Sequence, residues 1–163
     1  MRFLLCVAGG FALAGLYHSQ ASATPAQDCK KPVFLTFDTG HMAVAPVIAD
    51  ILARQKVVVT FFAANEKTKE GDGSLGEHWG DWWRERAKEG HEFASHTFNH
   101  VYWVADAGTH AFRVKPSAGS RQGKTYILDR HGYCEELSQS SRRLHMLTGK
   151  SPLPLFRAPG GRL

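Results

Sequence analysis

The sequence predicts an α/β protein built on parallel strands. Short segments rich in β-branched and aromatic residues alternate along the chain with longer segments whose apolar residues have helical spacing. The strand-like segments are apolar on both faces, which is typical of parallel strands covered by helices. With 163 residues, of which 43% are hydrophobic, the chain has the size and composition of one globular domain.

The first half of the chain predicts two strands and one long helix. Residues 33–37 (Val-Phe-Leu-Thr-Phe) are bounded by a proline and a glycine, which indicates a buried strand. Residues 42–56 carry valine, isoleucine and leucine at helical spacing and predict a helix. Residues 57–62 predict a second strand. Residues 65–80 are expected to form a loop.

The alternation continues in the second half. We expect a helix over residues 82–89 with Asp81 as its cap, a strand over 91–95, a helix over 133–148 and a fourth strand over 153–156. Residues 105–132 mix glycine, proline, serine and scattered charges. That composition indicates an insertion or a long surface loop.

Residues 1–23 predict a secretory signal peptide. A basic residue at position 2 precedes an apolar stretch too short to span a bilayer, and Ala21-Ser22-Ala23 forms a small-x-small cleavage site. The alternative, a buried N-terminal helix, is disfavoured by three glycines in the stretch. Residues 24–32 would then be a linker and 33–163 the folded domain, in a secreted or periplasmic protein.

Charge and cysteine content restrict the partners and the compartment. The net charge of +5 is spread along the chain, so we expect no nucleic-acid binding, and a basic surface suits an acidic cell-envelope polymer. Away from the N-terminus no apolar run reaches about 18 residues, so we expect no stable membrane insertion after signal cleavage. Cys29 and Cys134 would remain in the mature chain, either paired in a disulfide or unpaired.

Polar residues follow each of the four expected strands. They lie at positions 38–41 (Asp-Thr-Gly-His), 65–66 (Asn-Glu), 96–100 (His-Thr-Phe-Asn-His) and 157–161 (Arg-Ala-Pro-Gly-Gly). In α/β proteins the carboxyl ends of parallel strands open into the ligand crevice. A lone aspartate at a strand end would more often be a helix cap, but four such ends together predict a functional site.

His96 and His100 are candidate metal ligands. In an extended strand, residues four apart lie about 13 Å from each other and cannot share an ion. If the chain turns helically after Ser95, both imidazoles reach one ion at about 2.0–2.1 Å. The alternative is two surface or core histidines. A zinc-protease site is excluded because His91-Glu92 lacks a second histidine at the required spacing, and no G-x-S-x-G hydrolase elbow occurs.

Three motifs in order resemble the polysaccharide deacetylases, the NodB-homology domains of carbohydrate esterase family 4. They are residues 36–40 (Thr-Phe-Asp-Thr-Gly), 95–100 (Ser-His-Thr-Phe-Asn-His) and 156–159 (Phe-Arg-Ala-Pro). The connecting segments 59–62 and 89–93 are also similar, so that the resemblance covers residues 33–161.

The resemblance implies a distorted (β/α) barrel and metal-dependent removal of N-acetyl, sometimes O-acetyl, groups from a glycan. It implies that Asp38 is the general base and that Arg157 orients it. It further implies that His96 and His100 bind the metal. The expected cofactor is Zn²⁺, with Co²⁺ or Ni²⁺ as alternatives, because neutral imidazole suits these ions. The expected partner is an acetylated glycan.

The resemblance also places an oxyanion donor at the backbone N–H of Gly160, next to Pro159. These roles agree with general chemistry. A bound metal lowers the pKa of water to near 7 and polarises a carbonyl. A nearby carboxylate takes the water's proton, and a backbone N–H helps to stabilise the oxyanion.

The first departure from the family is Thr39. The family's first motif usually has two acids, and the second is a metal ligand. Threonine is a poor ligand, so the ion would be completed by water, by Asp38 or by extra contacts from Thr39 or His41. We expect weaker metal binding, a changed metal or, at worst, no catalysis.

The second departure is at the end of the chain. The family has later motifs, one of which supplies a histidine general acid from a Leu-x-x-His-like segment. Six residues follow Arg157 and none of them is histidine. We therefore expect a domain that is incomplete at its C-terminus and a chain that is inactive by itself. The other interpretation is that the general acid is missing.

Three functions from different classes remain to be compared. The first is a secreted polysaccharide deacetylase, and the second is a non-catalytic glycan-binding relative. The tryptophans Trp79, Trp82 and Trp83 would either stack on sugars or pack in the core. The third, a structural zinc module, needs four closed ligands, and only two strong candidates exist.

Overall fold

The computed structural model describes residues 31–161. The predicted signal peptide, most of the predicted linker and Cys29 lie outside the described residues, so these predictions and the disulfide remain predictions. Cys134 is exposed. In the described part of the chain, no helix is both long and apolar enough to cross a membrane.

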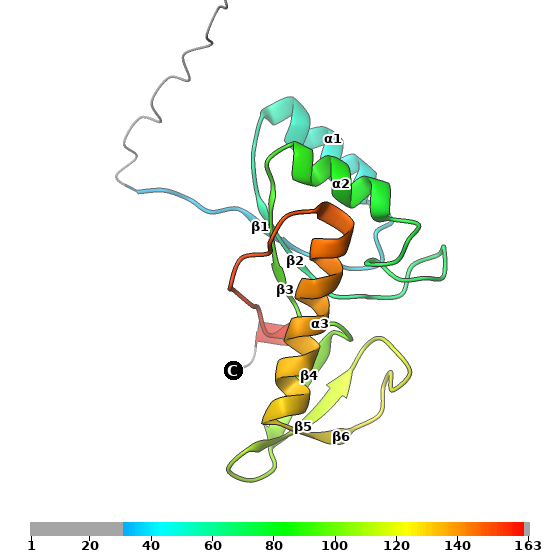
Figure 1. Cartoon of the computed structure of the whole chain (residues 1–163), viewed down its shortest axis with the longest axis vertical. Helices are drawn as coiled ribbons and strands as arrows, with labels where there is room; N and C mark the ends of the chain where they lie inside the picture. The colour runs from blue at the N-terminus through cyan, green and yellow to red at the C-terminus, as the bar shows by residue number, and fades with distance from the viewer. Residues whose placement is uncertain (1–30, 162–163) are drawn as a thin grey trace, which may run out of the picture. The chain divides into compact units, whose positions relative to one another are not determined.

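A three-stranded parallel sheet lies at the centre of the fold (Figure 1). Its strands are β1 (Thr36–Asp38), β2 (Thr60–Ala63) and β3 (Glu92–Ser95), in the order β1-β2-β3. Each strand is shorter than the sequence predicts. Val33, Phe34 and Val58 are exposed rather than buried in strands. In the described structure β1 has a neighbour on one side only, which leaves little backbone pairing to extend it.

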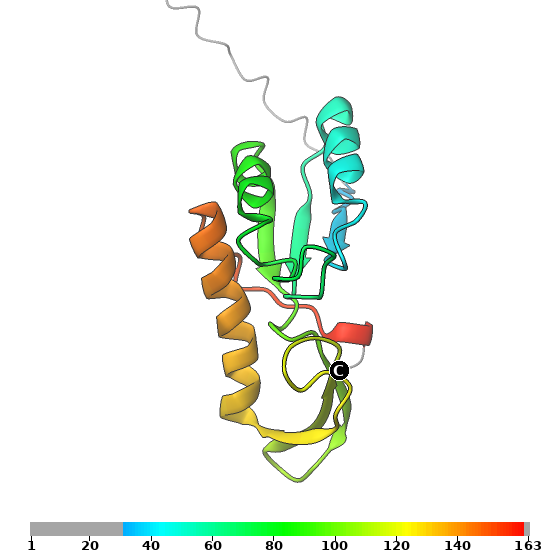
Figure 2. The same cartoon turned by 90° about the vertical axis from the view of Figure 1, so that its right-hand side faces the viewer.

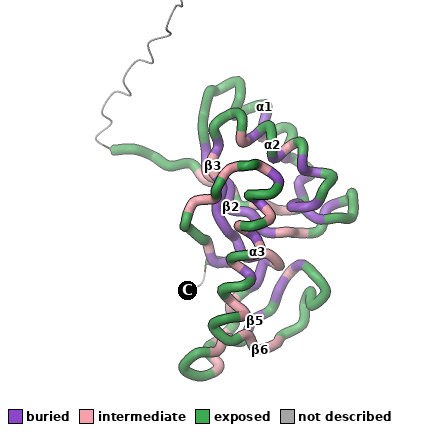
Figure 3. The backbone as a smooth tube through the Cα atoms, in the orientation of Figure 1, coloured by how far each residue is buried: buried purple, intermediate pink, exposed green. Residues whose placement is uncertain are grey.

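One face of the sheet carries a row of phenylalanines that forms the core. Phe37 pairs with Phe61 and Phe61 with Phe93 across the three strands. Their ring centroids lie 6.0 and 6.3 Å apart. Trp82 and Trp83 pack edge-on against Phe61. The buried segments of the tube in Figure 3 gather accordingly at β2 and β3.

Helices α1 (Ala45–Gln55) and α2 (Gly80–Lys88) connect these strands. Helix α1 has a proline in its first turn and ends at Lys56 with a left-handed φ of 54°, which stops the helix. Helix α2 begins before the predicted Asp81 cap. Asp81 instead lies in the first turn, where it forms an ion pair with Arg84.

Helix α3 (Arg130–Thr148) contacts β6 at one end and packs along β3 and α2. It begins three residues earlier than predicted because Asp129 caps it by accepting a hydrogen bond from Gly132 N. The helix runs from the end of β6 along β3 to α2 (Figure 2). Its Ser140 Oγ donates to Ala63 O at the end of β2.

The segment after β3 forms a second, antiparallel sheet. Its strands are β4 (Val101–Asp106), β5 (Ala111–Pro116) and β6 (Tyr126–Asp129). The prediction of a loop over residues 105–132 is therefore wrong for most of that segment. In β5, buried Val114 and Pro116 alternate with exposed charged residues. Those charges and the nearby glycines obscured the alternation in the sequence.

The fourth predicted strand is reduced to one parallel bridge between Ser95 and Phe156. Arg157 N then donates to Ser95 O, and the chain ends in the short 3-10 helix η1 (Pro159–Gly161). In the described residues the parallel strands thus form an open sheet rather than a closed barrel. The α/β class with parallel strands is confirmed.

Candidate active site

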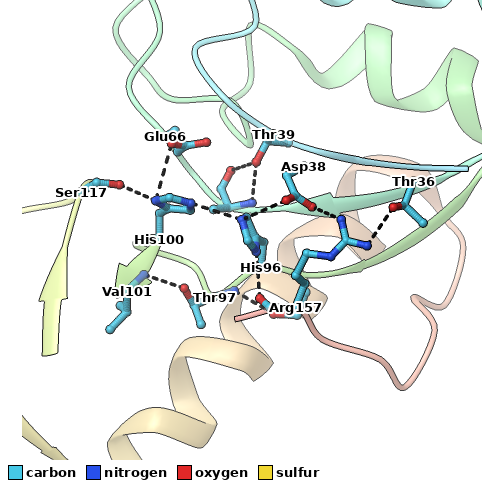
Figure 4. A network of polar contacts seen from close by, with 12 residues as sticks. Thr36, Asp38, Thr39, Glu66, His96, Thr97, His100, Val101, Ser117 and Arg157 are labelled. Atoms are coloured by element: carbon cyan, nitrogen blue, oxygen red, sulfur yellow. Dashed lines mark hydrogen bonds and ion pairs between the residues drawn. The ribbon is translucent and has the colours of Figure 1, made fainter. Parts of the chain in front are cut away.

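The carboxyl ends of the parallel strands meet, as the sequence predicts. Asp38 ends β1 opposite Phe62, which pairs in turn with Ala94 of β3. His96 follows β3 directly, and its N–H donates to Ala63 O. The Ser95–Phe156 bridge brings Arg157 to the same edge (Figure 4).

The two histidines converge through a tight turn that is not helical. Thr97 and His100 have left-handed φ values of 60° and 49°, which non-glycine residues rarely adopt. Val101 N donates to Thr97 Oγ1 at 2.7 Å, which closes the turn. The Nε2 atoms of His96 and His100 lie 3.2 Å apart. The predicted convergence is confirmed, and the predicted helical turn is wrong.

Helix α3 holds this turn from outside. The Glu136 carboxylate accepts hydrogen bonds from Asn99 N at 2.8 Å and from Asn99 Nδ2 at 2.7 Å. Phe98 N donates to the Glu136 carbonyl at 2.9 Å. Three bonds to one helical residue offset the strain of the left-handed turn.

The histidine pair fits one divalent cation. His96 Nδ1 lies 2.8 Å from Arg157 O, and since a carbonyl only accepts, this nitrogen carries the hydrogen. The lone pair of His96 Nε2 therefore points at His100 Nε2. Two nitrogens bound to one tetrahedral Zn²⁺ at about 2.0–2.1 Å lie about 3.3 Å from each other, close to the separation found here.

Burial keeps both imidazoles neutral, which is the form that binds metals. His96 and His100 are 3% and 8% exposed. Loss of solvation lowers the pKa of His96, although the Arg157 carbonyl and Asp38 act in the opposite direction. Loss of solvation together with the neighbouring His96 lowers the pKa of His100 to about 4.

Asp38 is held between Arg157 and His96. Arg157 Nη1 donates to Asp38 Oδ1 at 2.6 Å, and Arg157 Nη2 donates to Thr36 Oγ1 at 2.8 Å. The guanidinium also lies over the Phe62 ring, 4.2 Å from its centroid. The other carboxylate oxygen, Asp38 Oδ2, lies 3.8 Å from His96 Nε2. One oxygen is thus fixed, and the other faces the histidine pair.

Glu66 is a site residue to which sequence reasoning gave no role. Its Oε1 lies 3.7 Å from His100 Nδ1, and its Oε2 is buried without a hydrogen-bond partner among the described residues. Loss of solvation, reinforced by the Asp38 charge, raises the pKa of Glu66 to about 7. The sequence signal was its position directly after the second strand.

Thr39 and His41, the two possible extra metal contacts, form hydrogen bonds with the backbone instead. Thr39 Oγ1 accepts from Ala64 N at 2.8 Å and donates to Ala64 O at 3.2 Å, which fastens β1 to the end of β2. His41 Nδ1 accepts from Ala43 N. Within residues 31–161, no group of three or more His, Cys, Asp and Glu side chains is arranged to hold a metal. Among the described residues the two imidazoles meet at this point, and Asp38 Oδ2 lies 3.8 Å from His96 Nε2.

Gly160, which follows Pro159, lies beside Tyr102, and Tyr102 lies beside His100. A Cβ atom at Gly160, which has a φ of 76°, would come within 2.9 Å of the Tyr102 ring, so only glycine fits. The Tyr102 ring lies 4.9 Å from that of His100. Pro159 is buried. The predicted oxyanion segment thus lies beside Tyr102, whose ring lies beside that of His100.

The tryptophans are mainly core residues. Trp83 is fully buried and Trp79 is 9% exposed. Trp82 is partly buried, packs on the core and also lines a pocket beside Asp38 and Thr39. Core packing, one of the two interpretations offered above, is therefore confirmed for Trp79 and Trp83.

Solved structures of carbohydrate esterases share this fold. The chain is 22% identical to a family 4 carbohydrate esterase from Bacillus anthracis, with a TM-score of 0.51 over 78% of this chain and 48% of that one. It is 19% identical to the Xyl-CE4 domain of a multidomain xylanase from the hindgut metagenome of Trinervitermes trinervoides, with a TM-score of 0.54 over 80% and 49% of the chains. The comparison with curated proteins gave no match.

A third similar structure is that of a mutant of a CE4 family pseudoenzyme with restored enzymatic activity. It is 19% identical, with a TM-score of 0.54 over 84% of this chain and 39% of that one. The chain therefore spans half or less of the length of these solved structures. The model of the polysaccharide deacetylase family matches residues 26–163. This match covers the whole described site, and the chain belongs to the polysaccharide deacetylase family.

Proposed function

We propose that the chain carries the metal-binding and base-bearing part of a hydrolase that removes N-acetyl, or alternatively O-acetyl, groups from an envelope or extracellular polysaccharide. For an N-acetyl group, the reaction would break a carbon–nitrogen bond other than a peptide bond, in a linear amide. One observation carries the proposal. His96 and His100 face each other at 3.2 Å beside a carboxylate that an arginine holds in place.

The proposed cofactor is Zn²⁺, with Co²⁺ or Ni²⁺ as alternatives, held by the Nε2 atoms of His96 and His100. When bound, such an ion supplies a Lewis acid that acidifies water and polarises an acetyl carbonyl. The chain contributes neutral ligands in a buried setting, where electrostatic interactions are stronger than in water.

Asp38 is the proposed general base. Its Oδ2 is not occupied by Arg157 and faces His96, so it is placed to take a proton from an attacking water. Arg157 keeps the carboxylate from rotating through a charge-assisted hydrogen bond. The N–H of Gly160 is the proposed donor to the oxyanion of the tetrahedral intermediate.

The assignment contains no general acid for the leaving amine. We therefore expect the 163-residue chain by itself to release little acetate and the complete gene product to be the active species. The proposed substrate is an acetylated glycan, and the net charge of +5 supports an acidic envelope polymer as its setting. We further propose that residues 1–23 direct export, so that the protein acts in the periplasm or outside the cell.

A second candidate function is glycan binding without catalysis. Thr39 stands where the family usually has a second acid, and its hydroxyl is already committed to Ala64. One similar solved structure is of a mutant pseudoenzyme in this family whose activity was restored. Loss of catalysis on this fold is therefore a concrete alternative.

Acetate release from a panel of acetylated glycans, with and without a chelator, separates the two functions. The complete gene product should release acetate in a chelator-sensitive way, and the 163-residue chain is measured beside it. Asp38→Asn should abolish release, whereas Asp50→Asn, which alters an exposed carboxylate paired with Arg54, should not. Glycan binding without acetate release from any substrate would overturn the hydrolase and support the second candidate.

A further inference from the structure

One face of the antiparallel sheet carries two basic side chains next to each other. Arg113 and Lys115 are exposed and lie two residues apart on β5, so their side chains point to the same face of the sheet. Lys115 pairs with Tyr102 of β4, and Arg113 pairs with Ile127 of β6. Directly opposed residues of antiparallel strands share a face, so Tyr102 and Ile127 belong to the same surface. We call these four residues the basic face.

The opposite face of the sheet is covered from within the molecule. Val114 and Pro116, which alternate with the two basic residues along β5, are buried. On the same side, the Phe112 ring packs edge-on against Tyr133 of α3, with the ring centroids 5.5 Å apart. The basic face therefore points away from α3 and is open to solvent.

The basic face is continuous with the candidate active site through Tyr102. The Tyr102 ring lies 4.9 Å from the ring of His100 and also lies beside Gly160. Because Lys115 is directly opposite Tyr102, a basic side chain stands one residue pair away from the aromatic ring that borders the site. A polymer whose acetylated unit occupies the site can therefore extend over the basic face.

The two positive charges are not neutralised within the described part of the chain. No described carboxylate lies within ion-pair distance of Arg113 or Lys115. Of the two aspartates in the sheet, Asp129 caps α3, and Asp106 pairs with Phe112, whose ring packs on α3. Two uncompensated cations on an exposed face are complementary to negatively charged groups, and they bind carboxylates through charge-assisted hydrogen bonds.

We propose that the basic face extends the substrate-binding surface of the candidate active site, and that Arg113 and Lys115 bind the carboxylates of an acidic glycan. The substrate class is then a glycan that carries uronic acids beside its acetylated sugars. Continuity with the site favours a glycan over an anionic membrane, for which this continuity has no use. The position of the acetylated unit rests on the proposed function, whereas the binding of carboxylates to the basic face does not.

Calorimetric titration of the 163-residue chain with two matched oligosaccharides tests the proposal, with EDTA present so that no metal contributes. One is a hyaluronan oligosaccharide, in which N-acetylglucosamine alternates with glucuronate, and the other is the same oligosaccharide with its carboxyl groups reduced to alcohols. The charged form should bind about 5- to 30-fold more tightly, as expected for two exposed ion pairs. Arg113→Gln combined with Lys115→Gln should remove this preference and leave the affinity for the reduced form unchanged.

Two further double variants serve as controls. Arg54→Gln combined with Lys88→Gln lowers the net charge by the same amount on α1 and α2 and should keep the preference for the charged form. Arg113→Lys combined with Lys115→Arg keeps both charges of the basic face and should keep it too.

Three results would overturn the proposal. They are equal binding of the two oligosaccharides by the wild-type protein, binding of neither, and a preference that survives in the Arg113→Gln, Lys115→Gln variant. Binding to phosphatidylglycerol vesicles that this variant abolishes, without binding to either oligosaccharide, would assign the basic face to a membrane instead. Failure of the complete gene product to release acetate would overturn the proposed function and would leave the binding result intact.

Discussion

At the scale of single residues, the site depends on residues that each make two different contacts. Arg157 binds Asp38 through its side chain and His96 through its carbonyl. His96 uses Nδ1 for that carbonyl and keeps Nε2 for the cation position. Because the side chain and the backbone of Arg157 act separately, a change of its side chain affects the proposed base, Asp38, without removing the carbonyl partner of the proposed metal ligand, His96.

Arg157→Ala should therefore separate catalysis from metal binding. The loss of a charge-assisted bond to Asp38 is expected to lower acetate release by about 10- to 100-fold, which corresponds to roughly 1.5–3 kcal/mol. Zn²⁺ affinity should stay close to that of the wild-type protein, since His96 keeps its carbonyl partner. Arg142→Ala, an exposed arginine on α3, serves as the control. A loss of Zn²⁺ binding equal to the loss of turnover would contradict this division of roles.

Thr39→Asp should tighten Zn²⁺ binding, because it restores an acid at the position where the family usually has one. It should also lower the free energy of unfolding by about 1 kcal/mol, since the hydrogen bond donated to Ala64 O is lost. Thr39→Ser keeps both bonds to Ala64 and should change neither quantity. Titration with Zn²⁺ and denaturant unfolding test both effects, and an unchanged affinity in Thr39→Asp would reject the reasoning.

Some site residues could be predicted from the sequence and others could not. Asp38, His96 and Arg157 each follow a strand-like segment, and parallel strands place their carboxyl ends at one edge. Ser117 lies in a segment whose antiparallel pairing was not recognised, so its contact with His100 Nδ1 could not be foreseen. Glu66 was noted at a strand end, but the direction of its side chain depends on the loop that Ser74 stabilises.

At the scale of elements, α3 is the support of the histidine turn. The turn contains two left-handed residues and would not be stable by itself. Glu136 binds Asn99 through its carboxylate and Phe98 through its carbonyl. The geometry of the proposed metal site therefore depends on a helix that contributes none of the proposed ligands.

Glu136→Ala should lower both stability and metal affinity. Two hydrogen bonds from Asn99 to a charged acceptor are lost, and we expect a cost of about 2–4 kcal/mol in the free energy of unfolding. The adjacent Glu135→Ala removes only an exposed pair with Arg142 and should cost less than about 1 kcal/mol. Denaturant unfolding and Zn²⁺ titration of the two variants provide the comparison. Equal effects of the two substitutions would contradict the supporting role of α3.

The elements themselves were predicted unevenly. The three parallel strands were found from their β-branched and aromatic residues, and α1 was found from the helical spacing of its apolar residues. The start of α3 was misplaced because it is set by the Asp129 cap. The start of β1 was misplaced because β1 has a neighbouring strand on one side only, and residues 33–35 lie outside the strand. The sheet of β4, β5 and β6 was missed because the exposed residues of β5 are charged and because glycine, proline and serine are frequent in the segment. Here tertiary pairing overrode the local composition that indicated a loop.

At the scale of the whole molecule, burial keeps three histidines neutral. His91, His96 and His100 all have a pKa that is lowered mainly by loss of solvation. The unfolded chain takes up protons at these positions as the pH falls through about 6.5, whereas the folded chain resists. Glu66 acts in the opposite direction, because its pKa of about 7 lets the folded form take up a proton first.

His91→Gln isolates one of these contributions. His91 is 2% exposed, and burial lowers its pKa, as do Arg86 and Lys150, while the Glu89 charge acts against this. The wild-type protein should lose stability relative to this variant as the pH falls below about 6.5, by at most about 1.4 kcal/mol per pH unit. Unfolding curves across this range provide the test, with exposed His131→Gln as the control. A difference between wild type and variant that does not vary with pH would contradict the argument.

The central claim is that His96 and His100 share one divalent cation. Anomalous X-ray diffraction at the zinc absorption edge, from crystals grown with Zn²⁺, measures this directly. The account predicts one zinc peak about 2.0–2.1 Å from the Nε2 atoms of both histidines, with His96 Nδ1 still bonded to Arg157 O and His100 Nδ1 still bonded to Ser117 Oγ. No zinc between the two rings, or zinc bound through a Nδ1 atom, would contradict it.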